Sequence, residues 1–418
     1  MLTAISRYGA RVLPNTEQII AACKARGEFI QGPDVAAFEA AFARRHNMAP
    51  AHAITASFGR MAFYYILKAL ALPPGSEIII PALTFWVVPE LARVAGLQVV
   101  FADVDPATFT LDPSALERAI SPRTRAVVPT HLYGLPCDMD AIMAIASRHN
   151  LRVIEDCAHA LGATVGGKPV GTVGDAGFFS FQTLKPLNCY GGGLALVADA
   201  ALAARVRALA ESEKWPDQKR IENRLLVGKL QRIFIRPWVF TISAFPFLWI
   251  ASLVGGNPDV YLWEKIRRLD PLPEEYAERF SNVQAAIGVA ALERLEEWTD
   301  RTRRHVARLN EALGGLPDVQ IPQVPRGRTH VYYQYCVHAS KRDELVVRCV
   351  RRGVDIETLH VDVCSDMELF AGARVEPTGA PGARRAAGAM QIPVYSTLTD
   401  AQIERVARVV RTVLARPK

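Results

Sequence analysis

The stretch from residue 151 to residue 193 constrains the fold of this chain more than any other part. It opens with a short apolar run, Leu151–Ile154, which is typical of a buried parallel strand. A pair of acids that includes Asp156 ends this run, at the position where open α/β sheets bind their ligands. A second apolar run contains Ser180 near its end, and Lys185 follows closely. The pattern therefore predicts a parallel sheet with an acid and a lysine at the same edge.

An acid followed by a lysine 29 residues later, each just past a strand, is the arrangement that pyridoxal phosphate needs. Lys185 would form a Schiff base with the cofactor and then act as a general acid–base. Asp156 would keep the pyridinium nitrogen protonated, so that the ring can accept carbanion electrons. Ser180 would offer its hydroxyl to the cofactor phosphate. On spacing alone, a surface lysine and a strand-end acid of an unrelated α/β protein explain the pattern equally well.

The amino-acid sequence of this stretch resembles that of the DegT/DnrJ/StrS family of pyridoxal-phosphate aminotransferases, which act mainly on nucleotide-linked keto-sugars. The resemblance rests on VIEDCAHALGA, on GDAGFFSFQTLKPL and on Gly191–Gly193, and it extends over roughly residues 30–212 and 276–412. It implies an α/β fold of the aspartate-aminotransferase type (fold type I), with a large domain around a mostly parallel seven-stranded sheet and a small α+β domain. It also implies a homodimer with shared active sites, and glutamate or glutamine as the amino donor.

Four further residues fall at positions where the family contacts its cofactor. Gly59 opens an expected helix, whose backbone N–H groups would form an anion site for the phosphate. Arg60 replaces a family threonine, and it would either add a charge-assisted contact there or remain a solvated arginine. Phe85 matches an aromatic residue that stacks on the cofactor ring, although an apolar pair before a helix is more often core. His159 matches a Gln or His near the ring, whereas a lone histidine is usually structural.

Three places depart from the family pattern. Relatives carry an asparagine where this chain has Ala277, and that asparagine reaches the cofactor phosphate of the partner subunit. The loop Pro186–Gly191 replaces residues that are polar in the family. His360 falls near a substrate-facing His-Tyr-Pro segment that this chain does not preserve. The acceptor, the donor and the stereochemistry therefore stay open at this stage.

Length and composition fit a globular enzyme of two domains. The chain has 418 residues, of which 50% are hydrophobic and 22% are charged. We expect an N-terminal segment over residues 1–30, a large cofactor-binding domain over 31–300 and a small C-terminal domain over 301–418. The net charge is +7 without a basic tail or a basic–aromatic repeat, so no nucleic-acid partner is expected. The seven cysteines form no CxxC pair and the N-terminus has no signal-peptide core, which favours a reducing cytoplasm and no metal site.

Residues 213–275 do not resemble the family and are expected to form an insertion in the large domain. The net charge from Gln218 to Arg236 is +5, and Ile233–Val254 is an aromatic-rich apolar run that Pro237 and Pro246 interrupt. A single transmembrane span would place two halves of one catalytic domain on opposite sides of a bilayer. A broken hairpin that lies in the membrane interface is the favoured interpretation, and a buried dimer hairpin or an active-site lid is the alternative.

The sequence as a whole predicts an aminotransferase that moves an amino group from an amino acid to a keto acceptor, which is a nucleotide-linked keto-sugar. The intact Lys185 counts against a dehydratase, because relatives that eliminate water replace this lysine. Two alternatives remain, which are a lipid-linked or apolar ketone as acceptor and a non-catalytic regulatory member of the fold. The protein is expected in the cytoplasm, peripheral on the inner face of the membrane through residues 218–256.

Overall fold

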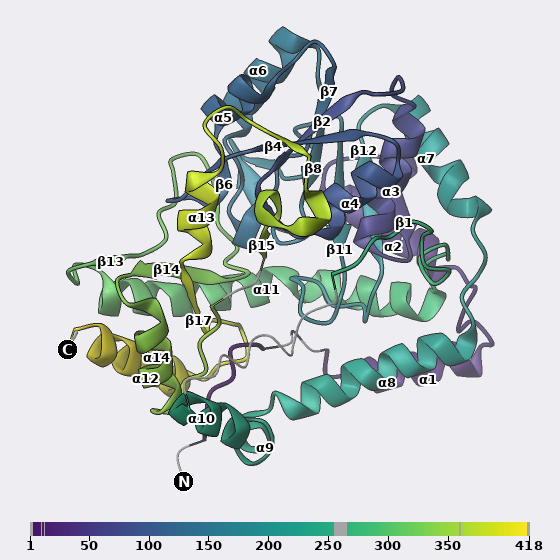
Figure 1. The fold of residues 1–418 in the computed structure, drawn as a ribbon. Coiled ribbons are helices and arrows are strands. Elements are labelled where there is room, and N and C mark those ends of the chain that lie inside the picture. Colours follow the sequence, from purple (N-terminus) through teal and green to yellow (C-terminus); the bar gives the residue numbers. More distant parts are fainter. Residues whose placement is uncertain (1–2, 10, 12, 255–265, 359–360, 416–418) are drawn as a thin grey trace.

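The computed structural model describes residues 3–9, 11, 13–254, 266–358 and 361–415 (Figure 1). His360 and residues 255–265, which are part of the insertion expected over 213–275, lie outside the described residues.

The large lobe is built around an eight-stranded sheet in the order β1-β12-β11-β8-β7-β2-β4-β16. β12 is antiparallel to both of its neighbours, and all other neighbouring pairs are parallel. The resemblance implied seven strands, and the eighth is β16, which has only two residues and therefore leaves no apolar pattern in the sequence. The strands are β1 (Ala53–Ala56), β2 (Glu77–Pro81), β4 (Gln98–Ala102), β7 (Thr124–Val127), β8 (Arg152–Asp156), β11 (Ala176–Ser180), β12 (Gly193–Val197) and β16 (Arg374–Val375).

Helices cover both faces of this sheet, so its central strands are buried on both sides. In β2, Ile79 packs into the core on one face, while Ile78 and Ile80 pack into the core on the other. The first face carries α2 (Asp34–Arg45), α5 (Pro113–Ala119), α6 (Met139–His149) and α11 (Asn282–Leu313). The second face carries α3 (Gly59–Leu70), α4 (Val87–Val94) and α7 (Ala200–Ser212). The predicted α/β class with a mostly parallel sheet is confirmed.

A smaller lobe has its own core around a three-stranded antiparallel sheet. The sheet consists of β13 (Val319–Gln320), β14 (Tyr335–Ala339) and β17 (Met390–Ile392), and it is covered by α12 (Arg342–Val350) and α14 (Asp400–Leu414). The N-terminal segment joins this lobe, because Ile5 pairs with Val354.

Helix α11 runs through both lobes (Figure 1). Its first half packs into the large core through residues such as Val283, and its last turns pack into the small core through Leu309 and Leu313. At 1.5 Å per residue, its 32 residues span about 48 Å. The domain boundary expected between residues 300 and 301 falls inside this helix.

Part of the C-terminal region lies on the large lobe. β15 (Asp362–Val363) pairs with β3 (Leu83–Thr84), β16 extends the large sheet, and α13 (Pro381–Ala387) packs into the second core. Two short ladders complete the described strands, and they are β5 (Val104–Asp105) with β6 (Thr110–Leu111) and β9 (Thr164–Val165) with β10 (Lys168–Pro169).

The expected insertion begins with three helices, α8 (Gln218–Phe234), α9 (Pro237–Ile242) and α10 (Phe245–Val254). The helical run is interrupted where Pro237 predicts it, since α8 ends at Phe234 and this proline begins α9. α8 lies beside α1 (Thr16–Ala25), to which it is joined by Lys24–Glu222 at 2.7 Å and by Lys229–Glu17 at 3.0 Å (Figure 1). In the part of the chain that the structure describes, no helix combines the length and the apolar character needed to cross a bilayer.

Candidate active site

Two parallel neighbouring strands deliver the acid and the lysine to one edge of the sheet. Asp156 is the last residue of β8 and Ser180 is the last residue of β11. Lys185 lies in the turn that follows, where its backbone N–H donates to the carbonyl of Gln182. The Asp156 side chain is buried and accepts a hydrogen bond from the backbone N–H of Ala158 at 3.0 Å. The sequence therefore predicted correctly that these residues lie at one sheet edge.

The surroundings of Asp156 and Lys185 disfavour the charged form of each side chain. Burial raises the pKa of Asp156 to about 6, although the positive charge of Lys185 opposes this change. Burial lowers the pKa of Lys185 to about 8, and nearby Arg60 lowers it further, whereas Asp156 raises it. A lysine with such a pKa has a substantial fraction of neutral amine near neutral pH, as a nucleophile or base requires.

His159 holds the amine of Lys185 in place. Its Nε2 lies 2.7 Å from the Lys185 Nζ, and its Nδ1 accepts a hydrogen bond from the backbone N–H of Tyr133 at 3.4 Å. Because Nδ1 is the acceptor, the proton of the neutral ring belongs on Nε2, which then donates to the lone pair of a neutral Lys185 amine. The geometry thus favours the same neutral form as the lowered pKa of the lysine.

Two tyrosines belong to this site that the sequence interpretation missed. Tyr333 stacks on His159, with ring centroids 4.3 Å apart, and the Lys185 Nζ lies 4.9 Å from the centroid of Tyr333. Tyr276 accepts a hydrogen bond from Arg60 through its hydroxyl. The dense run of tyrosines that includes Tyr333 was a usable signal, whereas Tyr276 stands alone in the sequence.

The start of helix α3 lies in close backbone contact with β11 and β12 next to Ser180. We call this place, formed by Gly59 and Ser180, the corner of the site. A Cβ on Gly59 would lie 2.6 Å from the carbonyl oxygen of Phe179 and 3.0 Å from the Cβ of Ser180. A Cβ on Gly193 would lie 2.1 Å from the backbone nitrogen of Gly59, so only glycine fits at either position. Phe58 gives α3 no side-chain cap, and its first turn has no acid. The corner is therefore a helix N-terminus beside a serine hydroxyl, which suits a phosphate group.

Arg60 and Phe85 lie together at this end of the site. The Arg60 guanidinium carbon is 5.7 Å from the ring centroid of Phe85 and 5.0 Å from that of Tyr276. Arg60 is thus held among aromatic rings rather than surrounded by solvent, and it lies close enough to influence Lys185. The structure brings together all of the predicted site residues, namely Gly59, Arg60, Phe85, Asp156, His159, Ser180 and Lys185.

The second acid of the pair, Glu155, has a different role. It is fully buried, and its carboxylate accepts backbone hydrogen bonds from Gly171, Val173 and Gly174. It also accepts from His131 at 2.9 Å, whose Nδ1 in turn accepts from a backbone N–H. The ligand atoms of Glu155, His131 and Cys157 lie within 4.8 Å of one another. Because the carboxylate and the imidazole already hold the chain together, we assign this cluster a structural role.

The loop Pro186–Gly191 is fixed by contacts from distant segments. Arg11 donates to the carbonyl of Pro186 at 2.9 Å, and Gln284 donates to the carbonyls of Cys189 and Tyr190. Helix α8 also lies against this loop, since Arg232 donates to the Tyr190 hydroxyl. The insertion therefore borders the active-site loop.

A polar cavity opens beside the lysine, where Leu184 and Tyr333 form part of its wall. Glu357 in this wall is buried and accepts a hydrogen bond from the Gln334 amide at 3.1 Å. The buried carbonyl oxygens of Gln334 and Gln391 have no hydrogen-bond partner in the part of the chain that the structure describes. The wall of the cavity is therefore built partly from side chains with hydrogen-bond acceptors. The remaining wall residues are Arg7, Tyr8, Gly9, Ile392, Val394 and Tyr395.

A mostly parallel sheet with a strand-end acid, a low-pKa lysine and a helix N-terminus beside a serine defines the aminotransferase class. The chain belongs to the DegT/DnrJ/EryC1/StrS aminotransferase family, whose sequence pattern matches residues 14–233 and 266–411. The predicted family and the predicted transaminase activity are confirmed. Residues 234–265, which lie between the two matched ranges, are a shorter stretch than the insertion expected over 213–275.

Known proteins resemble this chain over nearly its whole length. It is 31% identical over 388 residues to the UDP-N-acetyl-3-dehydro-alpha-D-glucosamine 3-aminotransferase of Acidithiobacillus ferrooxidans, covering 92% of this chain and 90% of the relative. It is 30% identical to the "Pleiotropic regulatory protein" of Geobacillus stearothermophilus, covering 97% of both chains. The crystal structure of the aminotransferase TlmJ from Streptoalloteichus hindustanus has a TM-score of 0.79 and 26% identity, and covers 98% of this chain and 99% of its own.

Proposed function

We propose that this enzyme uses pyridoxal phosphate to transfer an amino group from glutamate or glutamine to the keto group of a nucleotide-linked keto-sugar. The observation that carries the proposal is the contact of 2.7 Å between the Lys185 Nζ and the His159 Nε2. This contact lies at the edge of the sheet where Asp156 ends strand β8. The named substrate of the Acidithiobacillus relative supports the acceptor class. The enzyme is further proposed to be a cytoplasmic homodimer.

The residues of the site fit the cofactor. The buried Asp156 carboxylate suits the ring nitrogen, and the corner formed by Gly59 and Ser180 suits the phosphate. Phe85 would stack on a face of the cofactor ring, and His159 would lie near this ring. When bound, pyridoxal phosphate supplies a carbonyl for the amino group and a ring that takes up the electron pair released at the substrate Cα.

Each protein group then has a defined task. Lys185, in its neutral form, removes the proton from the Cα of the amino donor, and it delivers a proton to the acceptor carbon in the second half of the reaction. His159 orients the Lys185 amine through the hydrogen bond at Nζ. Asp156 keeps a negative charge in a buried place, where it stabilises the protonated ring nitrogen more strongly than it would in water.

The polar cavity supports a sugar acceptor over an apolar ketone. Its wall contains the Glu357 carboxylate, which already accepts hydrogen bonds, and the side chains of Gln334 and Gln391. Within the described residues the carbonyl oxygens of these two glutamines have no partner, and an apolar ketone would leave them so, at a cost of about 1–3 kcal/mol each, whereas sugar hydroxyls that reach them would satisfy them. The exposed apolar residues of the insertion favour a lipid-linked acceptor as the second candidate. A non-catalytic role is disfavoured, because a regulatory protein would not need Asp156, Ser180 and Lys185 together.

Borohydride reduction of the purified enzyme followed by peptide mapping tests the assignment of the lysine. We expect a pyridoxyl group on Lys185, and we expect Lys185→Ala to abolish transamination. The exposed Lys168 provides the control, since Lys168→Ala should change neither result. A pyridoxyl group on any other lysine would refute the assignment.

The two half-reactions identify the substrates separately. Glutamate or glutamine should abolish the absorbance of the lysine-bound cofactor in a single turnover, and the correct acceptor should restore it. Nucleotide-linked keto-sugars are compared with lipid-linked and apolar ketones in the second step. Restoration by an apolar ketone alone would contradict the proposed acceptor while leaving the transaminase intact.

A further inference from the structure

The insertion carries almost all of the exposed large apolar side chains of the described residues. The described residues include twelve such exposed side chains, and ten of them lie between Leu226 and Leu253. Isolated exposed apolar residues are ordinary, but a contiguous group of this size marks an interaction surface. The ten residues are Leu226, Val227, Leu230, Phe234, Trp238, Ile242, Phe247, Trp249, Ile250 and Leu253.

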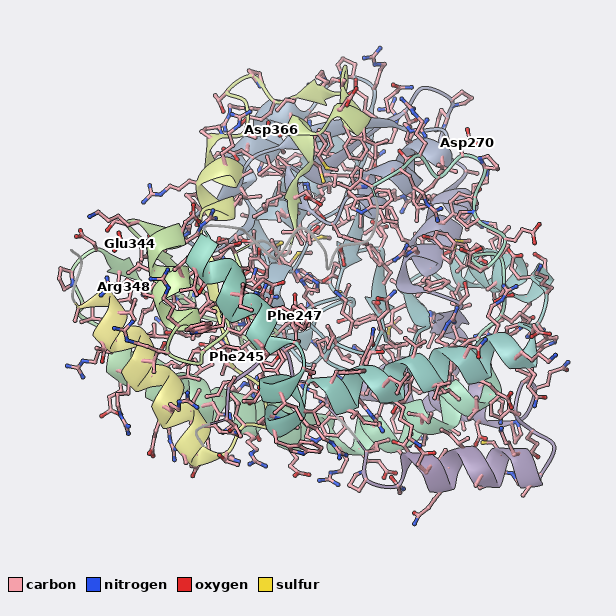
Figure 2. All side chains as sticks on the ribbon, turned by 60° about the horizontal axis from the view of Figure 1, so that its bottom comes forward. Phe245, Phe247, Asp270, Glu344, Arg348 and Asp366 are labelled. Carbon is pink, nitrogen blue, oxygen red and sulfur yellow. The ribbon has the colours of Figure 1, made fainter. Side chains whose placement is uncertain are left out.

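The most exposed of these residues lie on α9 and α10, whose inner sides are anchored. Phe247 is 75% exposed, Ile242 71% and Trp238 61%. The Thr241 hydroxyl accepts a hydrogen bond from the backbone N–H of Ala4, and Arg351 donates to the carbonyl of Ser252 at 2.8 Å. The two helices are thus held against the small lobe, and their aromatic and aliphatic side chains point outward. Figure 2 shows α10 with Phe245 and Phe247 on the front face, near Glu344 and Arg348 of α12.

The charges around this face are predominantly positive. No acidic residue occurs between Glu222 and Asp259 in the sequence, although Lys229 of this stretch is paired with Glu17 and Arg232 donates to Tyr190. Arg236 is exposed at the junction of α8 and α9. The exposed Arg351 and Arg352 follow the last turn of α12, which packs beside α10. An apolar centre next to exposed arginines is complementary to an apolar partner with a negative surface.

A second copy of the chain does not match this pattern well. A two-fold contact through this face would bring the same patch of both copies together, so that two positively charged surfaces would approach each other. An anionic lipid surface has the opposite charge at its headgroups and an apolar layer beneath them. Tryptophan is also enriched at that boundary, and Trp238 and Trp249 both belong to the exposed group.

We propose that the α9–α10 face docks the enzyme on a bilayer surface that contains anionic lipid. This face is defined as Trp238, Ile242, Phe247, Trp249, Ile250 and Leu253, together with Phe234 at the end of α8. The short helices lie along the surface and insert their apolar side chains at the headgroup level, while the arginines contact lipid phosphates. All seven residues of the face belong to residues 234–265, which the family pattern does not match, so docking is particular to this chain rather than to the fold.

Vesicle co-sedimentation of the full-length holoenzyme tests this proposal. Vesicles of phosphatidylglycerol and phosphatidylcholine should bind at least about tenfold more enzyme than pure phosphatidylcholine vesicles, and 0.5 M salt should reduce the difference. Ile242→Glu combined with Phe247→Glu should reduce binding to anionic vesicles at least about tenfold. The matched control is Val324→Glu, because Val324 is an exposed apolar residue outside this face and its replacement should leave binding unchanged.

Sedimentation velocity without lipid separates docking from self-association. The double variant should have the same mass in solution as the wild type and should retain its transamination of soluble substrates. A smaller mass for the variant would show that the face joins two copies of the chain, and would overturn the proposal. Equal binding of wild type and double variant to anionic vesicles, or no binding of either, would overturn it as well. These outcomes are independent of the acceptor, which is identified by the half-reactions.

Discussion

Asp156 has to carry a negative charge at neutral pH in surroundings that raise its pKa, whereas the lowered pKa of Lys185 favours the neutral amine that the reaction needs. Without cofactor, the ionised carboxylate of Asp156 is therefore less stable in the folded protein than in the unfolded chain. Such local destabilisation is typical of sites whose electrostatics serve a ligand or a reaction. A bound pyridinium would provide a positive partner that stabilises this carboxylate.

Asp156→Asn should therefore stabilise the cofactor-free enzyme while damaging catalysis. The pKa of Asp156 rises from 3.8 to about 6 on folding, so its ionisation destabilises the native state increasingly above pH 4, and fully above pH 6. We expect the variant to raise the free energy of unfolding by up to about 3 kcal/mol at pH 8 and to leave it unchanged below pH 4. Urea unfolding at the two pH values measures this difference, and turnover should fall by several orders of magnitude.

The exposed Asp140 gives the control for that experiment. Asp140→Asn should change the free energy of unfolding by less than about 0.5 kcal/mol at either pH. A variant of Asp156 that is less stable than the wild type at pH 8 would contradict the argument. A near-normal turnover would show that another residue contacts the ring nitrogen.

The sequence could identify the residues that lie at the end of a strand, because the strand itself is recognisable from its apolar residues. Asp156, Ser180 and Lys185 belong to this group, because the edge of a parallel sheet brings neighbouring strand ends together. Tyr333 and Tyr276 come from segments far away in the chain, and only the closed fold brings them to His159 and Arg60. The family resemblance indicated Gly59, Phe85 and His159, but it did not indicate that Arg60 is enclosed by aromatic rings.

At the scale of elements, the short strand β16 depends on ion pairs at both of its ends. Arg118 donates two hydrogen bonds to Glu376, at 3.0 and 3.1 Å, just after the strand ends. Arg374 on the strand donates to Glu77 at 2.7 Å. Burial opposes the ionisation of Glu376, yet hydrogen bonds from Arg118 and Thr378 lower its pKa to about 2. The carboxylate thus contributes stability that is present above its unfolded pKa and is lost as the pH falls through its folded pKa.

Glu376→Gln should destabilise the enzyme much more than the loss of an exposed ion pair. We expect a decrease of about 1–3 kcal/mol in the free energy of unfolding at pH 7, because a buried charged acceptor loses its partners. Glu117→Gln is the control, since Glu117 and its partner Arg148 are both more than half exposed and should contribute less than about 1 kcal/mol. Urea unfolding at pH 7 and at pH 2.5 measures both, and the difference between wild type and Glu376→Gln should shrink at the lower pH. Equal losses for the two variants would contradict this account.

The elements themselves differ in how far the sequence predicts them. Apolar runs of four or five residues with turns between them predict the central strands, since both faces of such strands are buried. β16 has two residues and is stabilised by pairing with β4, so no local pattern indicates it. The break at Pro237 was predictable from the ring of proline, whereas the attachment of α8 to α1 depends on long-range ion pairs.

At the scale of the whole molecule, the oligomeric state is the next test. The family resemblance implies a homodimer with shared active sites, and it also implies that Ala277 lacks one contact across that interface. We expect sedimentation equilibrium to give twice the chain mass of 45.9 kDa. Mixing Lys185→Ala subunits with wild-type subunits should give activity in proportion to the intact lysines. A fully active monomer would contradict the dimer and leave the site within one chain.

The pairing of β16 with β4 also has a consequence for how the protein is made. Val100 and Phe101 of β4 pair with Arg374 and Val375, which lie near the other end of the chain. On the ribosome, β4 therefore remains an unprotected edge strand until almost all of the polypeptide has been synthesised. Premature termination before Arg374 leaves this edge open to pairing with another nascent chain, so truncated products of this protein should aggregate rather than persist as soluble fragments.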